Sequence, residues 1–221
     1  MSYLPAPAEC VAEAENLFYL RGAPGRLGKL LAHYEIYKQI VGLPGALVEL
    51  GVYKGASLAR FATFRSLLES DSSRAIHGFD AFGAFPRDGV SGPLDQAFIA
   101  EFEGERGEGI AKSDLAAILD EKPFRNVHLH EGNIFDTLPR HLESEPALRI
   151  ALLHLDLDVY EPTAFALDRL LPHMVRGGIV MFDDYGMVEG ATRSADETVD
   201  RLGVRLEKLS LYAVPSFFRI P

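Results

Sequence analysis

Short apolar runs alternate with stretches of helical character through the middle of the chain, from residue 46 to residue 182. Strands that alternate with helices form βαβ units, because two parallel strands need a long crossover connection. The sequence therefore predicts an α/β fold with a mostly parallel sheet and helices on both of its faces. The expected strands are Ala46–Leu50, Ala75–Phe79, Val127–His130, Ile150–Leu155 and Ile179–Phe182, and the expected helices between them include Ser57–Glu69, Phe135–Glu143 and Pro162–Leu171.

The C-terminal segment follows a different pattern. Two apolar runs, Leu206–Val214 and Ser216–Ile220, are separated only by Pro215. A connection this short cannot cross over to a parallel neighbour, so the two runs have to pair in opposite directions. We therefore expect a C-terminal antiparallel hairpin beside the parallel strands.

Two further regions lie outside this alternation. Residues 1–44 are predicted to form a helical N-terminal extension, because apolar residues recur at helical spacing until Gly42 and Pro44 end the pattern. Residues 83–121 form an insert that is rich in glycine and acidic residues. Such an insert is either a solvated helix pair with a loop or a lid over a pocket. A single domain of residues 1–221 accommodates all of these elements.

Composition and charge exclude several classes of protein. The chain has 22 Lys+Arg against 32 Asp+Glu, a formal net charge of −10, which argues against binding of duplex nucleic acid because phosphate contacts need clustered basic residues. The sole cysteine, Cys10, cannot form an intrachain disulfide, and neither a secretory signal nor a membrane-spanning apolar run is apparent. We therefore expect a cytoplasmic protein without a nucleic-acid or membrane partner. The net acidity names no other partner.

A glycine-rich turn follows the first expected strand. Gly51 allows the chain to turn sharply, Gly55 allows a ligand to approach the backbone, and Ser57 is placed to cap the next helix. Glu49 lies in the otherwise apolar strand and needs a partner if it is buried. The turn lacks the G-x-G-x-x-G pattern of NAD-binding proteins, and Asp80 ends the second strand where a ribose is commonly bound. An ordinary turn and a capping Asp80 are the plain alternatives, but together these features favour a nucleoside cofactor.

Four acidic residues follow two apolar strands that we expect to be neighbours. Asp156 and Asp158 end one strand, and Asp183 and Asp184 end the next. Ionised carboxylates this close repel one another unless a cation lies among them, and oxygen ligands suit Mg²⁺. Each acid has a structural alternative, as a helix cap or a strand end. His154, two residues before Asp156, is interpreted as a core histidine bonded to a backbone carbonyl rather than as a site residue.

These motifs resemble those of the macrocin O-methyltransferase family, whose members are class I methyltransferases with a Rossmann-like, seven-stranded sheet. The resemblance extends from about residue 16 onward and is carried by the blocks Gly45–Arg65, Phe79–Pro86, Gly132–Pro139, Leu155–Pro162 and Phe182–Gly186. It implies an enzyme that uses S-adenosylmethionine and Mg²⁺ to methylate a hydroxyl of a small molecule, either a sugar or another natural-product intermediate. Asn133 departs from the family pattern and the N-terminal region is short, so the acceptor stays open. A homodimer is a candidate assembly.

The resemblance also implies roles for individual residues. Asp156, Asp183 and Asp184 would bind the metal, and Asp158 would be the general base. Asp80 would hold the ribose of the cofactor. The remaining cofactor-binding candidates around the methionine end are Glu49, Gly51, Tyr53 and Ser57. Phe82 and residues 110–114 would flank the adenine, with Asp136 nearby.

Two other functions fit parts of the pattern. A metal-dependent glycosyltransferase also places a D-x-D motif after an apolar strand, but Glu49, the glycine turn and the C-terminal hairpin favour methyl transfer. A catalytically silent, cofactor-binding partner protein would be expected to have lost its metal ligands, whereas all four acids are present.

Overall fold

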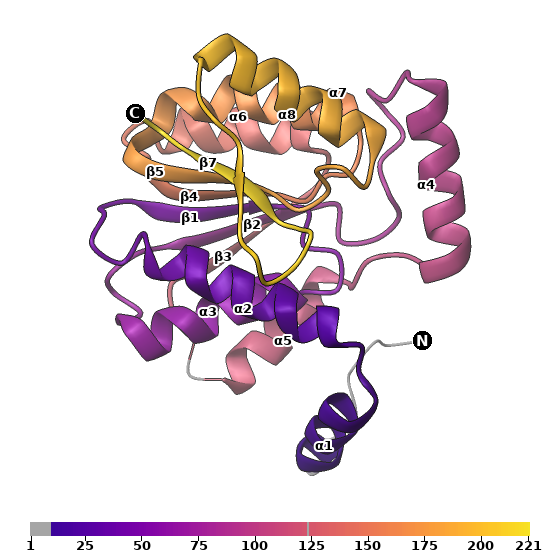
Figure 1. Ribbon diagram of the computed structural model, residues 1–221, viewed down its shortest axis with the longest axis vertical. Helices are drawn as coiled ribbons and strands as arrows, with labels where there is room; N and C mark the ends of the chain where they lie inside the picture. The colour runs from indigo at the N-terminus through magenta and orange to yellow at the C-terminus, as the bar shows by residue number, and fades with distance from the viewer. Residues whose placement is uncertain (1–9, 123) are drawn as a thin grey trace.

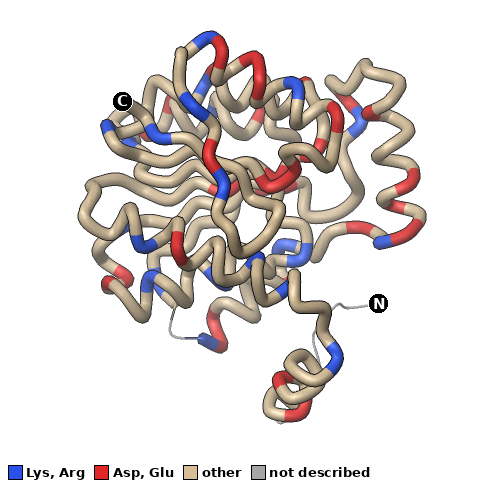
Figure 2. The backbone as a smooth tube through the Cα atoms, viewed as in Figure 1, with Lys and Arg blue, Asp and Glu red and all other residues tan. Residues whose placement is uncertain are grey.

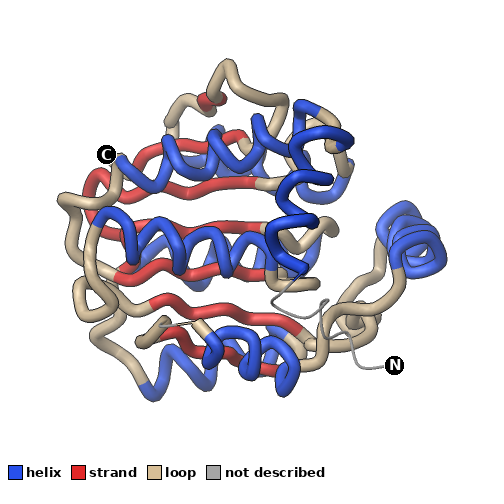
Figure 3. The backbone as a smooth tube through the Cα atoms, turned by 90° about the horizontal axis from the view of Figure 1, so that it is seen from below, coloured by secondary structure: helices blue, strands red, loops and turns tan. Residues whose placement is uncertain are grey.

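A computed structural model describes residues 10–122 and 124–221, so residues 1–9 of the expected N-terminal extension lie outside the described part. Its centre is a seven-stranded sheet with the order β3-β2-β1-β4-β5-β7-β6 (Figures 1 and 3). The five strands β1 to β5 are parallel, and β7 runs antiparallel to both β5 and β6. The strands are β1 (Ala46–Leu50), β2 (Ile76–Asp80), β3 (Val127–Glu131), β4 (Ile150–Leu155), β5 (Met174–Phe182), β6 (Glu207–Lys208) and β7 (Ser216–Arg219). The predicted mixed sheet is confirmed.

Helices cover both faces of the sheet, as the sequence predicts. Helices α2, α3 and α5 pack on one face, and α6, α7 and α8 pack on the other (Figure 1). Each face has its own apolar core, because alternate residues of the central strands point to opposite sides. The helices are α1 (Val11–Arg21), α2 (Pro24–Lys38), α3 (Ala56–Leu68), α4 (Pro93–Arg106), α5 (Lys112–Glu121), α6 (Ile134–Ser144), α7 (Tyr160–Leu170) and α8 (Glu189–Leu202), with a 3₁₀ turn at Leu171–His173.

The N-terminal region and the insert differ in how they join this body. Helix α2 is part of the core, with Ile36 and Tyr37 fully buried, whereas α1 has no buried residue and stands away from the sheet (Figure 1). The insert at residues 83–121 contains α4 and α5, and α5 belongs to the core through Leu115 and Leu119. Among the described residues, no helix is long and apolar enough to span a bilayer. The cytoplasmic location stays a prediction.

The C-terminal hairpin is antiparallel, as expected, but the extent predicted for its first strand is wrong. Only Glu207 and Lys208 pair with β7, and residues 209–215 leave the sheet and cross α2 (Figure 1). Two glycines of α2 make room for this loop, because a Cβ at Gly25 would lie 2.4 Å from the Tyr212 ring and one at Gly28 would lie 2.5 Å from the Leu211 carbonyl oxygen. Packing on α2 therefore replaces strand pairing for the apolar residues of this run.

The strand ends at the centre of the sheet are aligned by hydrogen bonds. The amide of Gly51 donates to Phe79, that of Asp156 to Leu50, and that of Asp183 to Leu155, each at 2.9 Å. The strand order reverses between β1 and β4, and ligands of open α/β sheets bind outside the carboxyl ends at such a switch point. The residues that follow β1, β2, β4 and β5 are thereby brought to one place.

Replacing Gly51 by alanine tests how closely the ends of β1 and β4 approach. Gly51 has a φ of +88°, and a Cβ there would lie 1.8 Å from the carbonyl oxygen of Asp156. We expect Gly51→Ala to lower the free energy of unfolding by about 2–4 kcal/mol, because alanine is strained at this φ and the strand ends would have to separate. Urea unfolding followed by circular dichroism measures the change.

Gly42→Ala is the matched control for this experiment, because nothing lies within 4 Å of a Cβ at that position. It should change the free energy of unfolding by less than about 0.5 kcal/mol. Equal effects of the two substitutions would contradict the close approach at Gly51.

Candidate active site

A pocket lies at the carboxyl ends of the central strands, beside the switch point. It contains about 820 Å³ of empty space, part of which is open to solvent. Figure 2 shows that acidic residues gather at this end of the sheet. The walls are formed by strand ends, by the first turn of α6 and by the insert, and include Gly51, Tyr53, Asp80, Phe85, Phe102, Glu103, Gly109, Asn133, Phe135, Asp156 and Asp158.

Asp80 organises the turns around this pocket. Its carboxylate accepts hydrogen bonds from the amides of Val52 and Tyr53, at 2.7 and 2.8 Å, and from the amide of Phe82 at 2.6 Å. Tyr53 and Phe82 have positive φ values of 51° and 55°, which are unfavourable for side chains of this kind. Strained residues of this type cluster at functional sites, where the surrounding contacts hold them. Asp80 therefore lines the pocket and also fixes two strained loop residues.

Glu49 and Ser57 contact each other behind the glycine turn. The Ser57 hydroxyl donates to Glu49, and Glu49 is fully buried. The expectation that Ser57 caps α3 is wrong: Gly55, with φ +81°, is the N-cap residue, and the serine hydroxyl is used by the buried carboxylate instead. Of the predicted cofactor-binding residues, Gly51, Tyr53 and Asp80 line the pocket, whereas Glu49, Ser57 and the exposed Asp136 are not among the described residues that do.

His154 links Glu49 to Asp183 inside the protein, so its interpretation as a histidine bonded to a backbone carbonyl is wrong. Its Nδ1 lies 3.4 Å from Glu49, and its Nε2 lies 3.6 Å from Asp183. Burial opposes a charged imidazole, but the two carboxylates raise the pKa of His154 to about 10. The side chain is therefore an imidazolium held between two buried carboxylates at neutral pH.

Asp183 has two further partners, both from α2. The Lys29 ammonium donates to one carboxylate oxygen, and His33 lies 3.5 Å from the other. Burial alone would raise the pKa of Asp183, but His154, His33 and Lys29 hold it well below the usual range. The sequence analysis missed Lys29 and His33. Their spacing of four residues on one face of a predicted helix was the available signal.

The other three acids form a separate group. Carboxylate oxygens of Asp156, Asp158 and Asp184 lie within 4.8 Å of one another, and the Asp158 amide donates to Asp184 at 3.3 Å. Asp158 has a φ of +61°, a third strained residue beside the pocket. Burial and the neighbouring carboxylates raise the pKa of each of these three acids well above its usual value.

The charge balance of the four acids fits a divalent cation. Lys29 lies in the electrostatic field of Asp156, Asp183 and Asp184, and it compensates Asp183 by direct contact. The raised pKa values of Asp156, Asp158 and Asp184 show that one ammonium does not compensate the others. Closely spaced carboxylate oxygens are the donors that Mg²⁺ prefers. The donor set is therefore suited to a hard divalent cation.

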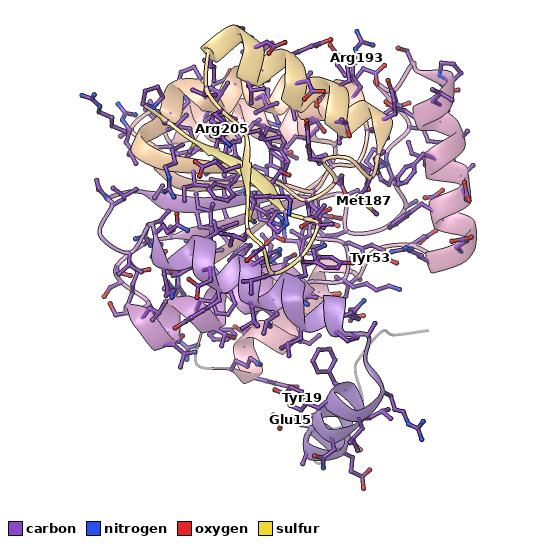
Figure 4. The ribbon with its side chains drawn as sticks, in the orientation of Figure 1. Glu15, Tyr19, Tyr53, Met187, Arg193 and Arg205 are labelled. Atoms are coloured by element: carbon purple, nitrogen blue, oxygen red, sulfur yellow. The ribbon has the colours of Figure 1, made fainter. Side chains whose placement is uncertain are left out.

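The insert supplies one wall of the pocket. The amide of Ile110 donates to the Tyr53 carbonyl at 2.8 Å, and the Tyr53 hydroxyl donates to the carbonyl of Arg106 at 2.8 Å, at the end of α4. Figure 4 shows Tyr53 between the body of the protein and the lower end of α4. The insert is thus attached to the glycine turn through backbone groups. Movement of this wall as a lid stays a prediction.

The strand order and the switch-point pocket are those of the Rossmann-like class I methyltransferase fold. Two solved methyltransferase structures support this class. The calicheamicin methyltransferase CalS11 aligns over 97% of this chain and 86% of that chain, with a TM-score of 0.71 and 27% identity. The O-methyltransferase NovP aligns over 87% and 79%, with a TM-score of 0.73 and 22% identity, and supports the fold alone.

Residues 26–214 match the family described as Macrocin-O-methyltransferase (TylF), and the chain belongs to this family. The resemblance inferred from the sequence motifs is thereby confirmed.

Two curated relatives are similar over part of their length. The chain is 33% identical over 153 residues to 8-demethyl-8-(2,3-dimethoxy-alpha-L-rhamnosyl)-tetracenomycin-C 4'-O-methyltransferase of Streptomyces olivaceus, which is 66% of this chain and 55% of that protein. It is 31% identical over 185 residues to demethyldecarbamoylnovobiocin O-methyltransferase of Streptomyces niveus, which is 73% of this chain and 65% of that protein. The matched region thus spans less than two thirds of either relative.

His154→Gln tests the imidazolium between Glu49 and Asp183. The folded-state pKa of about 10 lies above the ordinary histidine value of 6.5, so the stabilisation is complete below about pH 6.5 and is lost as the pH rises through about 10. Near pH 7 the substitution should lower the free energy of unfolding by about 3–5 kcal/mol, because it removes the positive charge beside the buried Glu49 and one of the partners of Asp183. The difference from the wild type should shrink as the pH approaches 10.

His173→Gln is the matched control for this pH series, because His173 is a half-buried histidine whose Nδ1 lies 3.2 Å from the backbone carbonyl of Leu148. Denaturant unfolding at several pH values between 6 and 10 compares the two variants. A penalty for His154→Gln that does not change over this range would contradict the charged state.

Proposed function

We propose that the protein is an O-methyltransferase that uses S-adenosylmethionine and Mg²⁺ to methylate a hydroxyl of a sugar or another natural-product intermediate. The observation that carries this proposal is the group of three half-buried, incompletely compensated carboxylates, Asp156, Asp158 and Asp184, beside the switch-point pocket. Membership of the macrocin O-methyltransferase family supports the same reaction.

The cofactor is proposed to occupy the part of the pocket beside Gly51 and Asp80. Both residues line the pocket, and Asp80 ends β2 in the position from which an acid accepts ribose hydroxyls. Oδ2 of Asp80 already accepts from two amides, but Oδ1 accepts from only one, so Oδ1 keeps a lone pair for a ribose hydroxyl. Glu49 and Ser57 would act from behind the turn, by fixing its shape.

The cation is proposed to bind Asp156, Asp183 and Asp184, the three acids to which the family resemblance assigns the metal. Asp183, which contacts Lys29, is the one of the three that lies outside the group of Asp156, Asp158 and Asp184. A bound divalent cation supplies positive charge that lowers the pKa of a nearby hydroxyl. Asp158 is proposed to remove the proton of that hydroxyl. Its raised pKa moves it in the direction that a general base requires, since an ordinary aspartate is too weak a base for this task.

The rest of the catalysis is proposed to come from alignment. Methyl transfer requires the acceptor oxygen, the methyl carbon and the sulfur to lie in line, and holding two reactants in such a geometry supplies about 7–11 kcal/mol of barrier reduction. The aromatic side chains Phe85, Phe102 and Phe135 line the pocket and can hold an apolar acceptor body against the strand ends. A sugar diol attached to such a body would fit both the apolar wall and the acids.

The names of the relatives support a glycosylated acceptor. The Streptomyces olivaceus protein is named for a rhamnosyl tetracenomycin, and one solved relative is titled a TDP-rhamnose 3'-O-methyltransferase. Asn133 distinguishes this chain from the family pattern. It caps α6 and donates to the carbonyl of Asp88 in the insert at 3.1 Å, so it joins two walls of the pocket. We propose that this joint contributes to acceptor choice.

Calorimetric titration with S-adenosylhomocysteine tests the cofactor and the metal without an acceptor. We expect one cofactor per chain, and a separate one-to-one binding of Mg²⁺ that Asp156→Asn and Asp184→Asn weaken at least about tenfold, because each loses a charged ligand. Asp168→Asn is the matched control, since Asp168 is exposed and pairs with Arg201. Thermal stabilisation by nucleotide sugars but not by S-adenosylhomocysteine would support the glycosyltransferase alternative instead. Cofactor binding without Mg²⁺ binding would support a silent partner protein.

Asp158→Asn tests the general base. Asparagine has the shape of aspartate and tolerates a positive φ, so the variant should fold and bind S-adenosylmethionine normally. With an acceptor found from a panel of rhamnosides, sugar nucleotides and catechols, kcat should fall by about 10²–10⁴-fold. Release of S-adenosylhomocysteine measures the rate, and Asp168→Asn again serves as the control. Wild-type kcat with an unchanged pH profile would exclude Asp158 as the base.

A further inference from the structure

Four of the seven histidines lie together at the open edge of the sheet, away from the acids. His77 is on β2, His128 and His130 are on the edge strand β3, and His141 is on α6. In the parallel register His77 lies opposite His128 and Phe79 lies opposite His130, so all of these side chains point to the face that α6 covers. The proposed methyl transfer uses none of these four histidines.

Three of them form a compact group of imidazoles. Ring nitrogens of His77, His130 and His141 lie within 4.8 Å of one another, and Nδ1 of His77 lies 3.1 Å from Nε2 of His130. The ring centroids of His141 lie 4.8 Å from His77 and 4.5 Å from His130. Two nitrogens that bind the same zinc ion in a tetrahedral site are about 3.3 Å apart, as follows from Zn–N distances of about 2.0–2.1 Å. Small shifts of the His141 ring would complete such an arrangement.

The group also has the burial and the free nitrogen that a ligand site requires. His77 and His141 are each 8% exposed, and Nε2 of His141 has no hydrogen-bond partner among the described residues. A buried nitrogen without a partner is costly, and a bound ion would remove that cost. His128 is exposed beside the group and stacks on His77 with a centroid distance of 5.1 Å, so the group lies close to the surface.

The protonation state of the group is compatible with metal binding. Burial, followed by repulsion among the histidines, lowers the pKa of His77 to about 3 and that of His130 to about 4, and burial also lowers the pKa of His141. The imidazoles are therefore neutral at physiological pH, and a neutral imidazole offers the lone pair that a metal needs.

We propose that His77, His130 and His141 form a binding site for a borderline transition-metal ion of the Zn²⁺ class, separate from the carboxylate site. Imidazole nitrogens select Zn²⁺, Co²⁺, Ni²⁺ or Cu²⁺, whereas carboxylate oxygens suit Mg²⁺. The site joins three elements, and His130 stacks on Phe79 at 4.2 Å, which lines the pocket. A bound ion would hold β2, β3 and α6 together at the edge strand.

Titration of the full-length chain with Co²⁺ and then Zn²⁺ tests this site. We expect one Co²⁺ per chain with visible d–d absorption that Zn²⁺ abolishes by displacement, and a rise of Tm in the presence of Zn²⁺, because a ligand bound only to the folded state stabilises it. His141→Gln and His130→Gln should each weaken binding at least about tenfold and remove the rise in Tm. Two variants are used because His141 is buried and His130 only half-buried, so loss of folding in one leaves the other as the test.

Two controls separate this site from the rest of the protein. His173→Gln removes a histidine outside the group and should leave Co²⁺ binding unchanged. A double variant, Asp156→Asn with Asp184→Asn, should also keep it, although it is expected to lose Mg²⁺. Absence of Co²⁺ and Zn²⁺ binding to the wild type, or binding that survives in His130→Gln and His141→Gln but is lost in the double aspartate variant, would overturn the proposal.

Discussion

The structure depends on how buried carboxylates at the ends of β1, β4 and β5 are compensated. A chain of polar contacts runs from Ser57 through Glu49 and His154 to Asp183, and it ends at Lys29 on α2. Buried charges are stable only with partners, so this series of contacts holds Asp183 ionised inside the protein. Asp156, Asp158 and Asp184 lie just beyond it without comparable partners. Positive side chains thus balance the charge of Asp183 but not that of the other three acids, and a cation bound beside them would supply the missing positive charge.

Backbone strain gathers at the same end of the sheet. Of the four non-glycine residues with positive φ among those described, Tyr53 and Asp158 line the pocket, and Phe82 lies between two lining residues, Ala81 and Gly83. Asp80 holds Tyr53 and Phe82 through its backbone contacts, and the Asp158 amide is held by Asp184. Gly51 allows the strands to come close enough for these contacts to form. The strained loops and the buried acids therefore stabilise each other, and loss of either would loosen the other.

The features that could be predicted from the sequence are those that depend on apolar periodicity and on position along the chain. Alternating apolar runs located the parallel strands, and acids after two neighbouring strands located the carboxylate cluster. The predictions that were wrong concern residues whose partners are determined by tertiary contacts. Ser57 would cap a helix by local rules, but a buried Glu49 uses its hydroxyl. The run at residues 206–214 has strand character, but α2 offers it a packing surface. The partners of His154, Glu49 in β1 and Asp183 directly after β5, are distant from it in sequence, so no local pattern identifies them.

The two groups of residues proposed to bind metal ions differ in how they depend on pH. The carboxylates are crowded, so protons compete with a cation for them. Because their pKa values are raised, this competition extends to pH values above those at which an ordinary aspartate is protonated. The histidines at the sheet edge are the opposite case, because their lowered pKa values leave the nitrogens free of protons well below neutral pH. A site of mutually repelling carboxylates favours a hard, doubly charged ion. A site of neutral imidazoles has no net charge to attract a cation, so its affinity depends on how well the ion bonds to nitrogen. If both proposals hold, the two ions would not substitute for each other, and each site would fill independently of the other.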